Sequence, residues 1–162
     1  MTITTDLEAA NAQYAASFTK GHLPIPPKRK LAIVTCMDAR INVFSALGLS
    51  EGDAHVIRNA GGRASEALRS LVISQRLLGT EEVVIVHHTD CGMLTFSDGD
   101  IRAKIKEELG EDASGIQFLP FGDLEESVRE DVRFVRESRL VRGAVSGYVY
   151  QVESGRVVRL DE

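Results

Sequence analysis

Residues 31–40 read LAIVTCMDAR, an apolar run that ends in a cysteine, an aspartate and an arginine. A continuous run rich in β-branched residues is typical of a strand buried on both faces, as in a parallel sheet. Residues 82–87 (EVVIVH) form a second such run directly before the polar stretch 88–91 (HTDC), and residues 55–58 form a weaker one. The sequence therefore predicts a parallel sheet in which two buried strands are followed by chemically reactive side chains.

Helical patterns alternate with these strands. Three segments have apolar residues at helical spacing: 64–78, 100–109 and 123–139. The first two stop at a glycine and the third opens on Asp123, which are typical C-cap and N-cap residues. Residues 144–152 and 157–160 are separated by a Glu-Ser-Gly turn and predict a hairpin. The expected fold is α/β: a central, mostly parallel sheet flanked by helices, with an antiparallel C-terminal edge hairpin.

The whole chain of 162 residues is expected to form one domain, residues 1–162. Its net charge of −5 argues against binding to nucleic acid or to an anionic membrane, because both need a basic surface. No apolar run approaches the roughly 20 residues that cross a bilayer. The first 30 residues also lack the charge pattern of a secretory or mitochondrial signal. We therefore expect a cytoplasmic protein.

The N-terminal region, residues 1–27, is set apart by its composition. Residues 5–19 have the spacing of an amphipathic helix, and the prolines that follow them cannot continue it. A helix attached by an extended connector packs either on a partner subunit or on its own domain. The sequence pattern leaves both possibilities open.

Two cysteines and a histidine follow the two strongest strands. Cys36 comes directly after the first strand, and His88 and Cys91 come after the other. Because the carboxyl ends of parallel strands meet at one edge of a sheet, these side chains are expected to lie together. Two thiolates and an imidazole are ligands that zinc prefers, and three protein ligands leave a position open, as in catalytic sites. The competing histidine, His87, should point the other way because strand side chains alternate.

Other polar residues flank this predicted zinc site, and each has a less specific alternative. Asp38 should lie beside the metal with Arg40 within reach of its carboxylate, where an arginine keeps a carboxylate ionised and oriented; the alternative is a surface ion pair. The pair Gly61 and Gly62 follows a strand and precedes a helix, where backbone N–H groups favour anions. A plain tight turn is the alternative there, and the cysteines themselves are alternatively small buried hydrophobes.

Taken together, three motifs resemble those of the β-class carbonic anhydrases: CMDAR at 36–40, RNAG at 58–61 and HTDCG at 88–92. The resemblance implies a zinc ion held by Cys36, His88 and Cys91, with Asp38 and Arg40 as the catalytic pair. It implies reversible hydration of carbon dioxide to bicarbonate by attack of zinc-bound hydroxide. It further implies a homodimer or a larger homo-oligomer in which the N-terminal helix reaches across to the neighbouring subunit.

The resemblance leaves several points open. Relatives with the same zinc site hydrolyse carbonyl sulfide or carbon disulfide, and a zinc-binding domain without turnover is a third possibility. His87 stands where the family often has glycine, and Gly62 where asparagine is frequent, so Gly61, Gly62 and His87 are the candidate substrate-binding residues. His87 and His55 are candidate proton shuttles, and transfer to buffer in an exposed site would serve equally. In some members the aspartate itself takes the fourth zinc position, which for Asp38 stays undecided.

Overall fold

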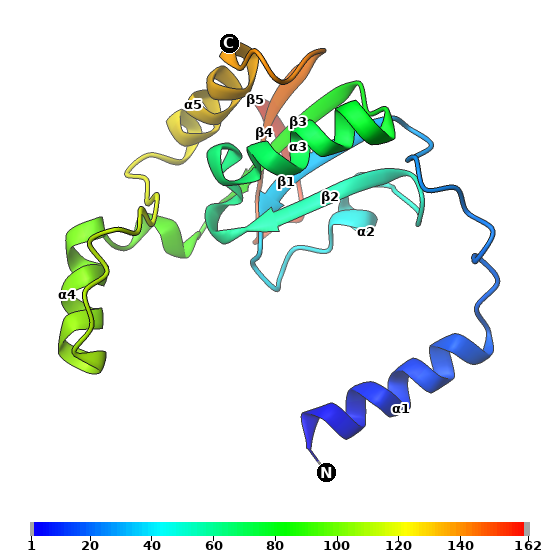
Figure 1. Cartoon of the computed structure of the whole chain (residues 1–162), viewed down its shortest axis with the longest axis horizontal. Helices are drawn as coiled ribbons and strands as arrows, with labels where there is room; N and C mark the ends of the chain where they lie inside the picture. The colour runs from blue at the N-terminus through cyan, green and yellow to red at the C-terminus, as the bar shows by residue number, and fades with distance from the viewer. Residues whose placement is uncertain (1, 161–162) are drawn as a thin grey trace.

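A computed structural model describes residues 2–160 and contains one five-stranded sheet over that range, with the order β2-β1-β3-β4-β5 (Figure 1). The strands are β1 Leu31–Cys36, β2 Ala54–Asn59, β3 Glu82–His88, β4 Val145–Tyr150 and β5 Val157–Leu160. Every neighbouring pair is parallel except β4 and β5, which form the antiparallel edge. The predicted α/β fold with its C-terminal hairpin is confirmed.

The helices of the described chain are α1 Ile3–Ala16, α2 Val43–Leu47, α3 Ala64–Leu78, α4 Asp98–Leu109 and α5 Leu124–Glu137, with 3-10 turns at Ala60–Gly62 and Gly92–Leu94. The predicted caps are present, because Gly79 and Gly110 adopt left-handed conformations and Asp123 accepts a hydrogen bond from the Glu126 N–H. Sequence periodicity missed α2, which at five residues is too short to show a pattern. Among the helices of residues 2–160, none has the length and apolar character needed to cross a lipid bilayer.

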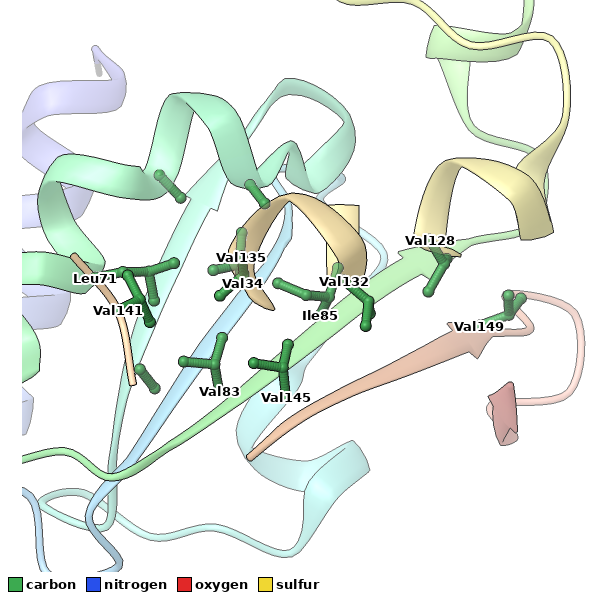
Figure 2. Close-up of a cluster of buried hydrophobic side chains, with 13 residues drawn as sticks. Val34, Leu71, Val83, Ile85, Val128, Val132, Val135, Val141, Val145 and Val149 are labelled. Atoms are coloured by element: carbon green, nitrogen blue, oxygen red, sulfur yellow. The ribbon is translucent and has the colours of Figure 1, made fainter. Parts of the chain in front are cut away.

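Helices α3 and α5 cover one face of the sheet. Figure 2 shows part of the core beneath them, in which Val34 of β1 and Ile85 of β3 lie with Val132 and Val135 of α5. Each aliphatic side chain removed from water in this way contributes roughly 1.5–3 kcal/mol. Alternate residues of β3 face a second cluster on the other side, which contains Val86 and the two cysteines. Strand alternation thus places successive residues of β3 in different surroundings.

Helix α1 lies away from the sheet, joined to it by an extended connector (Figure 1). None of its residues is buried, and Ile3, Leu7 and Tyr14 are 79%, 66% and 53% exposed. The helix therefore does not pack on its own domain within the described chain. Packing on a partner subunit stays a prediction.

Candidate metal centre

The structure brings the three predicted ligands together at the carboxyl edge of the sheet. Cys36 ends β1, His88 ends the neighbouring strand β3, and Cys91 precedes the turn Gly92–Leu94. The two sulfur atoms and a ring nitrogen all lie within 4.8 Å of one another, and all three side chains are buried. The parallel pairing of β1 with β3 produces this proximity, because it aligns Thr35 with Val86 just before the ligands.

The His88 ring has one nitrogen ready to bind a metal. Its Nδ1 lies 2.8 Å from the carbonyl oxygen of Thr89, an acceptor, so Nδ1 carries the hydrogen. The other nitrogen, Nε2, is buried and has no hydrogen-bond partner among the residues of the described chain. A buried polar atom without a partner is costly, and a metal ion would provide the missing interaction.

The two thiols are electronically suited to a metal as well. A hydrogen bond from the Cys91 thiol, opposed by burial and assisted by His88, lowers the pKa of Cys36 to about 4. The backbone N–H groups of Asp38 and Gly61 contribute to the same shift. The pKa of Cys91 is raised, mainly by the same contact with Cys36. One thiolate is therefore available at neutral pH, and thiolates rather than thiols bind metals.

Asp38 lies beside this cluster and is fixed by Arg40. Its Oδ2 is 3.8 Å from His88 Nε2. Arg40 donates from Nε to Oδ1 at 3.0 Å and from Nη2 to Oδ2 at 2.7 Å, and its backbone N–H donates to Oδ1 at 2.9 Å. These bonds hold the pKa of Asp38 well below its usual range and raise that of Arg40. The carboxylate thus stays ionised at the position that the Cys36-x-Asp38-x-Arg40 spacing indicates.

Asp90 and Arg58 stabilise the loops that follow β1 and β3, and the sequence analysis gave neither residue a role. Arg40 also donates to the carboxylate of Asp90 at 2.7 Å and to its carbonyl at 3.0 Å, which links the loop after β1 to the loop after β3. Arg58 donates to three backbone carbonyls, those of Cys36 at 2.9 Å, Asp38 at 2.6 Å and Ile41 at 3.2 Å. The sequence signal for Arg58 was its place in the RNAG motif, but its acceptors are backbone atoms that no side-chain pattern reveals.

The paired glycines form a turn packed against the end of β1 and against Met93. Both have positive φ, 79° at Gly61 and 69° at Gly62. A Cβ on Gly62 would lie 2.8 Å from the Thr35 carbonyl carbon, and one on Gly61 would lie 2.9 Å from Met93 Cγ. Only glycine fits such a conformation at such a close approach. Contact of either glycine with substrate stays a prediction.

The remaining histidines lie elsewhere. His87 is fully buried and faces α5, with Nδ1 2.7 Å from Ser127 Oγ and Nε2 3.2 Å from Asp131 Oδ2, so its ring points away from the neighbouring His88. His55 pairs with Ala32 near the start of β1, four residues before the ligand edge, or about 13 Å along the strand. That distance is too long for direct proton transfer from His55 to the site.

Comparisons with known proteins agree with this geometry. Residues 31–157 match the family model described as carbonic anhydrase. The chain is 46% identical to "Beta-carbonic anhydrase 1" of Mycobacterium tuberculosis, with 97% of each chain covered. It is also 46% identical to the carbonic anhydrase of Streptococcus mutans, whose crystal structure superposes with a TM-score of 0.94 over 99% of each chain.

A carbon disulfide hydrolase of Acidithiobacillus thiooxidans is also similar, at 35% identity over 82% of this chain and 78% of that protein. Proteins similar to this chain are therefore named for two reactions. The carbonic anhydrase family model spans most of this chain. The protein belongs to the β-carbonic anhydrase family.

Proposed function

We propose that the protein catalyses the reversible hydration of carbon dioxide to bicarbonate at a zinc ion held by Cys36, His88 and Cys91. The observation that carries this proposal is the buried cluster of three ligand atoms within 4.8 Å of one another, with the Asp38 carboxylate beside it. A sulfur–sulfur–nitrogen donor set fits zinc and leaves a fourth position open. The relatives at 46% identity are named as carbonic anhydrases, which supports the same reaction here.

Each residue of the site has a defined task in this proposal. Zinc, when bound, supplies a Lewis acid that lowers the pKa of water from 15.7 to about 7. Asp38 is ionised and therefore only accepts hydrogen bonds. It orients the nucleophilic oxygen by accepting a hydrogen bond from it. Arg40 holds that carboxylate in one orientation through its parallel Nε and Nη2 bonds. The ligands and Asp38 together place the nucleophile for attack on the substrate carbon.

Hydrolysis of carbon disulfide or carbonyl sulfide is the second candidate. The relative at 35% identity that is named carbon disulfide hydrolase favours it specifically. These molecules are linear triatomic electrophiles like carbon dioxide, so the same residues would serve each reaction, and the shape of the pocket would select among them. The higher identity to the carbonic anhydrases supports carbon dioxide as the substrate.

Stopped-flow kinetics on the zinc-loaded protein separates the candidates. Carbon dioxide hydration is followed with a pH indicator, and sulfide release is followed from carbonyl sulfide and carbon disulfide in parallel. Fast hydration with little sulfide release is expected. Rapid sulfide release with slow hydration would assign the second function instead, and zinc binding with no turnover on any substrate would leave a non-catalytic zinc domain.

We propose that the protein is a homodimer or a larger homo-oligomer in which α1 packs on a partner subunit. Two observations support this: the apolar side chains of α1 are exposed, and the sheet face opposite α3 and α5 leaves Val56, Val84 and Tyr148 only half-buried. Light scattering on the full chain would test it. A mass near 17.7 kDa for the wild-type chain would contradict it, whereas dissociation of a Leu7→Asp variant would support it.

We also propose a cytoplasmic location and a small-molecule substrate as the natural partner. The support is chemical, because Cys36 and Cys91 are free thiols lying close together and must stay reduced to bind a metal. The cytoplasm keeps thiols in that state. Fractionation of the cells that make the protein would check the location.

A further inference from the structure

A second buried polar cluster lies next to the metal centre, and the mechanism above does not use it. His87, Ser127 and Asp131 are all nearly inaccessible to solvent, and Arg63 is buried beside them. Burying such groups costs free energy unless each one finds a partner. Their hydrogen-bond and ion-pair partners show which part of the structure this cluster stabilises.

Asp131 of α5 contacts the first residues of α3. Its Oδ2 accepts a hydrogen bond from the Ala64 N–H at 2.9 Å, and its Oδ1 lies 3.1 Å from Arg63 Nη2. A carboxylate at the N-terminus of a helix is favourable, because free N–H groups point at it. Residues 63 and 64 directly follow the Gly61–Gly62 turn, so Asp131 fixes the end of that turn nearest α3.

His87 fixes the turn itself. Its Nε2 lies 3.2 Å from the Gly62 carbonyl oxygen and 3.2 Å from Asp131 Oδ2. Both of those oxygens are acceptors, so Nε2 carries a hydrogen. The ring is held by Ser127 at its Nδ1 and by stacking on Phe121, with ring centroids 5.4 Å apart. The Gly62 carbonyl is therefore held by a donor that cannot easily rotate.

The Gly61–Gly62 turn contacts Cys36, the first of the proposed metal ligands. The α-carbon of Gly62 packs so closely on the end of β1 that an added Cβ would lie 2.9 Å from the Cys36 backbone nitrogen. The Gly61 backbone N–H is also one of the groups that lower the pKa of Cys36. A shift of the turn would therefore displace the backbone of Cys36, and groups that orient ligands affect metal binding.

We propose that His87 and Asp131 are positioning residues for the metal centre, holding the Gly61–Gly62 turn against Cys36 from the α5 side of the sheet. The inference rests on the proposed zinc site and adds a support that lies beyond its ligands. A purely structural role would change only the stability of the protein. A positioning role also changes how the site binds metal.

Two substitutions of His87 in the full-length chain test this. His87→Leu removes both ring nitrogens, whereas His87→Gln keeps an amide N–H donor near the position of Nε2. Zinc affinity is measured by chelator competition, and the cobalt(II) form is examined for its thiolate-to-metal absorption. His87→Leu is expected to weaken zinc binding by about tenfold, the lower end for loss of a ligand-supporting group, and to shift the cobalt spectrum. His87→Gln is expected to restore most of both properties.

Val135→Ala is the matched control, because it removes buried volume from the same helix α5 within the apolar core. It is expected to lower the melting temperature and leave zinc affinity and the cobalt spectrum unchanged. If His87→Leu does not fold, Asp131→Asn replaces it, with weaker zinc binding expected.

The proposal is wrong if the folded His87→Leu or Asp131→Asn variant has wild-type zinc affinity and a wild-type cobalt spectrum. It is equally wrong if Val135→Ala weakens zinc binding as much as they do. A wild-type chain that binds no zinc would instead overturn the metal centre under "Proposed function". The two failures are therefore distinguishable.

Discussion

His87 and His88 are neighbours in the sequence and equally buried, but their ring nitrogens have different partners. Both nitrogens of His87 lie opposite protein oxygens, on Ser127, Gly62 and Asp131. His88 uses Nδ1 in the same way, but its Nε2 has no hydrogen-bond partner in the described chain and lies with the two cysteine sulfurs. The difference teaches that burial alone does not identify a ligand. A ring nitrogen that has no hydrogen-bond partner and lies close to other metal-binding atoms does identify one.

The largest effect is expected from His88→Ala, which removes one metal ligand. Zinc affinity should fall by more than the roughly 10- to 100-fold that loss of an outer partner costs, and activity should fall with it. Chelator competition and metal analysis of the purified variant measure this. The contrast with His87 would be contradicted if His87→Leu lost as much zinc as His88→Ala, because loss of a supporting residue should cost less affinity than loss of a ligand.

Asp38→Asn is expected to have the next largest effect on turnover, with zinc retained. The amide keeps the size of the side chain but presents a donor where the nucleophile needs an acceptor. Loss of a positioned proton-handling group typically costs about 10²–10⁴ in rate, which stopped-flow hydration would show. Asp98→Asn serves as the control, because Asp98 also pairs with an arginine, Arg102 at 3.0 Å, but on α4 outside the site. Unchanged hydration by Asp38→Asn would remove Asp38 from the mechanism.

The strands and the clustering of Cys36, His88 and Cys91 could be predicted from the sequence because their signals are local. Continuous β-branched runs identify buried strands, and parallel topology then brings residues at the ends of β1 and β3 together although 52 positions separate Cys36 from His88. Alternation along β3 also predicted correctly that His87 and His88 point apart. These inferences need only the order of residues and the geometry of a sheet.

The support around the site could not be predicted, because its partners are distant in sequence or are backbone atoms. Asp131 lies 44 residues from His87, in a segment with many charged residues. A signal did exist, since Asp131 is four residues from both Ser127 and Val135 and so falls on the buried stripe of α5. An acidic residue within an apolar stripe needs a buried partner, and the sequence does not say which one.

Arg40→Gln should reduce turnover less than Asp38→Asn, by up to about a hundredfold, because it leaves the carboxylate present but free to rotate. The pH dependence supplies a second test. Arg40 keeps the pKa of Asp38 below its usual value of about 3.9, so its removal should raise that pKa. A carboxyl whose pKa is depressed on folding stabilises the protein above its unfolded-state pKa and loses this effect as the pH falls through the folded-state pKa.

The variant should therefore lose the contribution of ionised Asp38 at a higher pH than the wild-type protein. Carbon-13 NMR titration of the aspartate carboxyls checks this directly. Arg40→Lys is the matched control, since it keeps the positive charge and loses the planar pair of donors. An unmoved Asp38 pKa in Arg40→Gln would contradict the assignment of Arg40 as its partner.

Asp90→Asn should have the smallest effect on turnover. It tests the contrast between Asp38 and Asp90, the two carboxylates that pair with Arg40. The Asp38 side chain is 17% exposed, whereas that of Asp90 is 77% exposed. Solvent screens an exposed ion pair strongly, so the rate should fall by no more than about fivefold. The Asp90 carbonyl still accepts from Arg40 at 3.0 Å after the substitution, so the guanidinium keeps one contact with this loop. A loss in stopped-flow hydration as large as that of Arg40→Gln would mean that Asp90, rather than Asp38, holds the arginine in place.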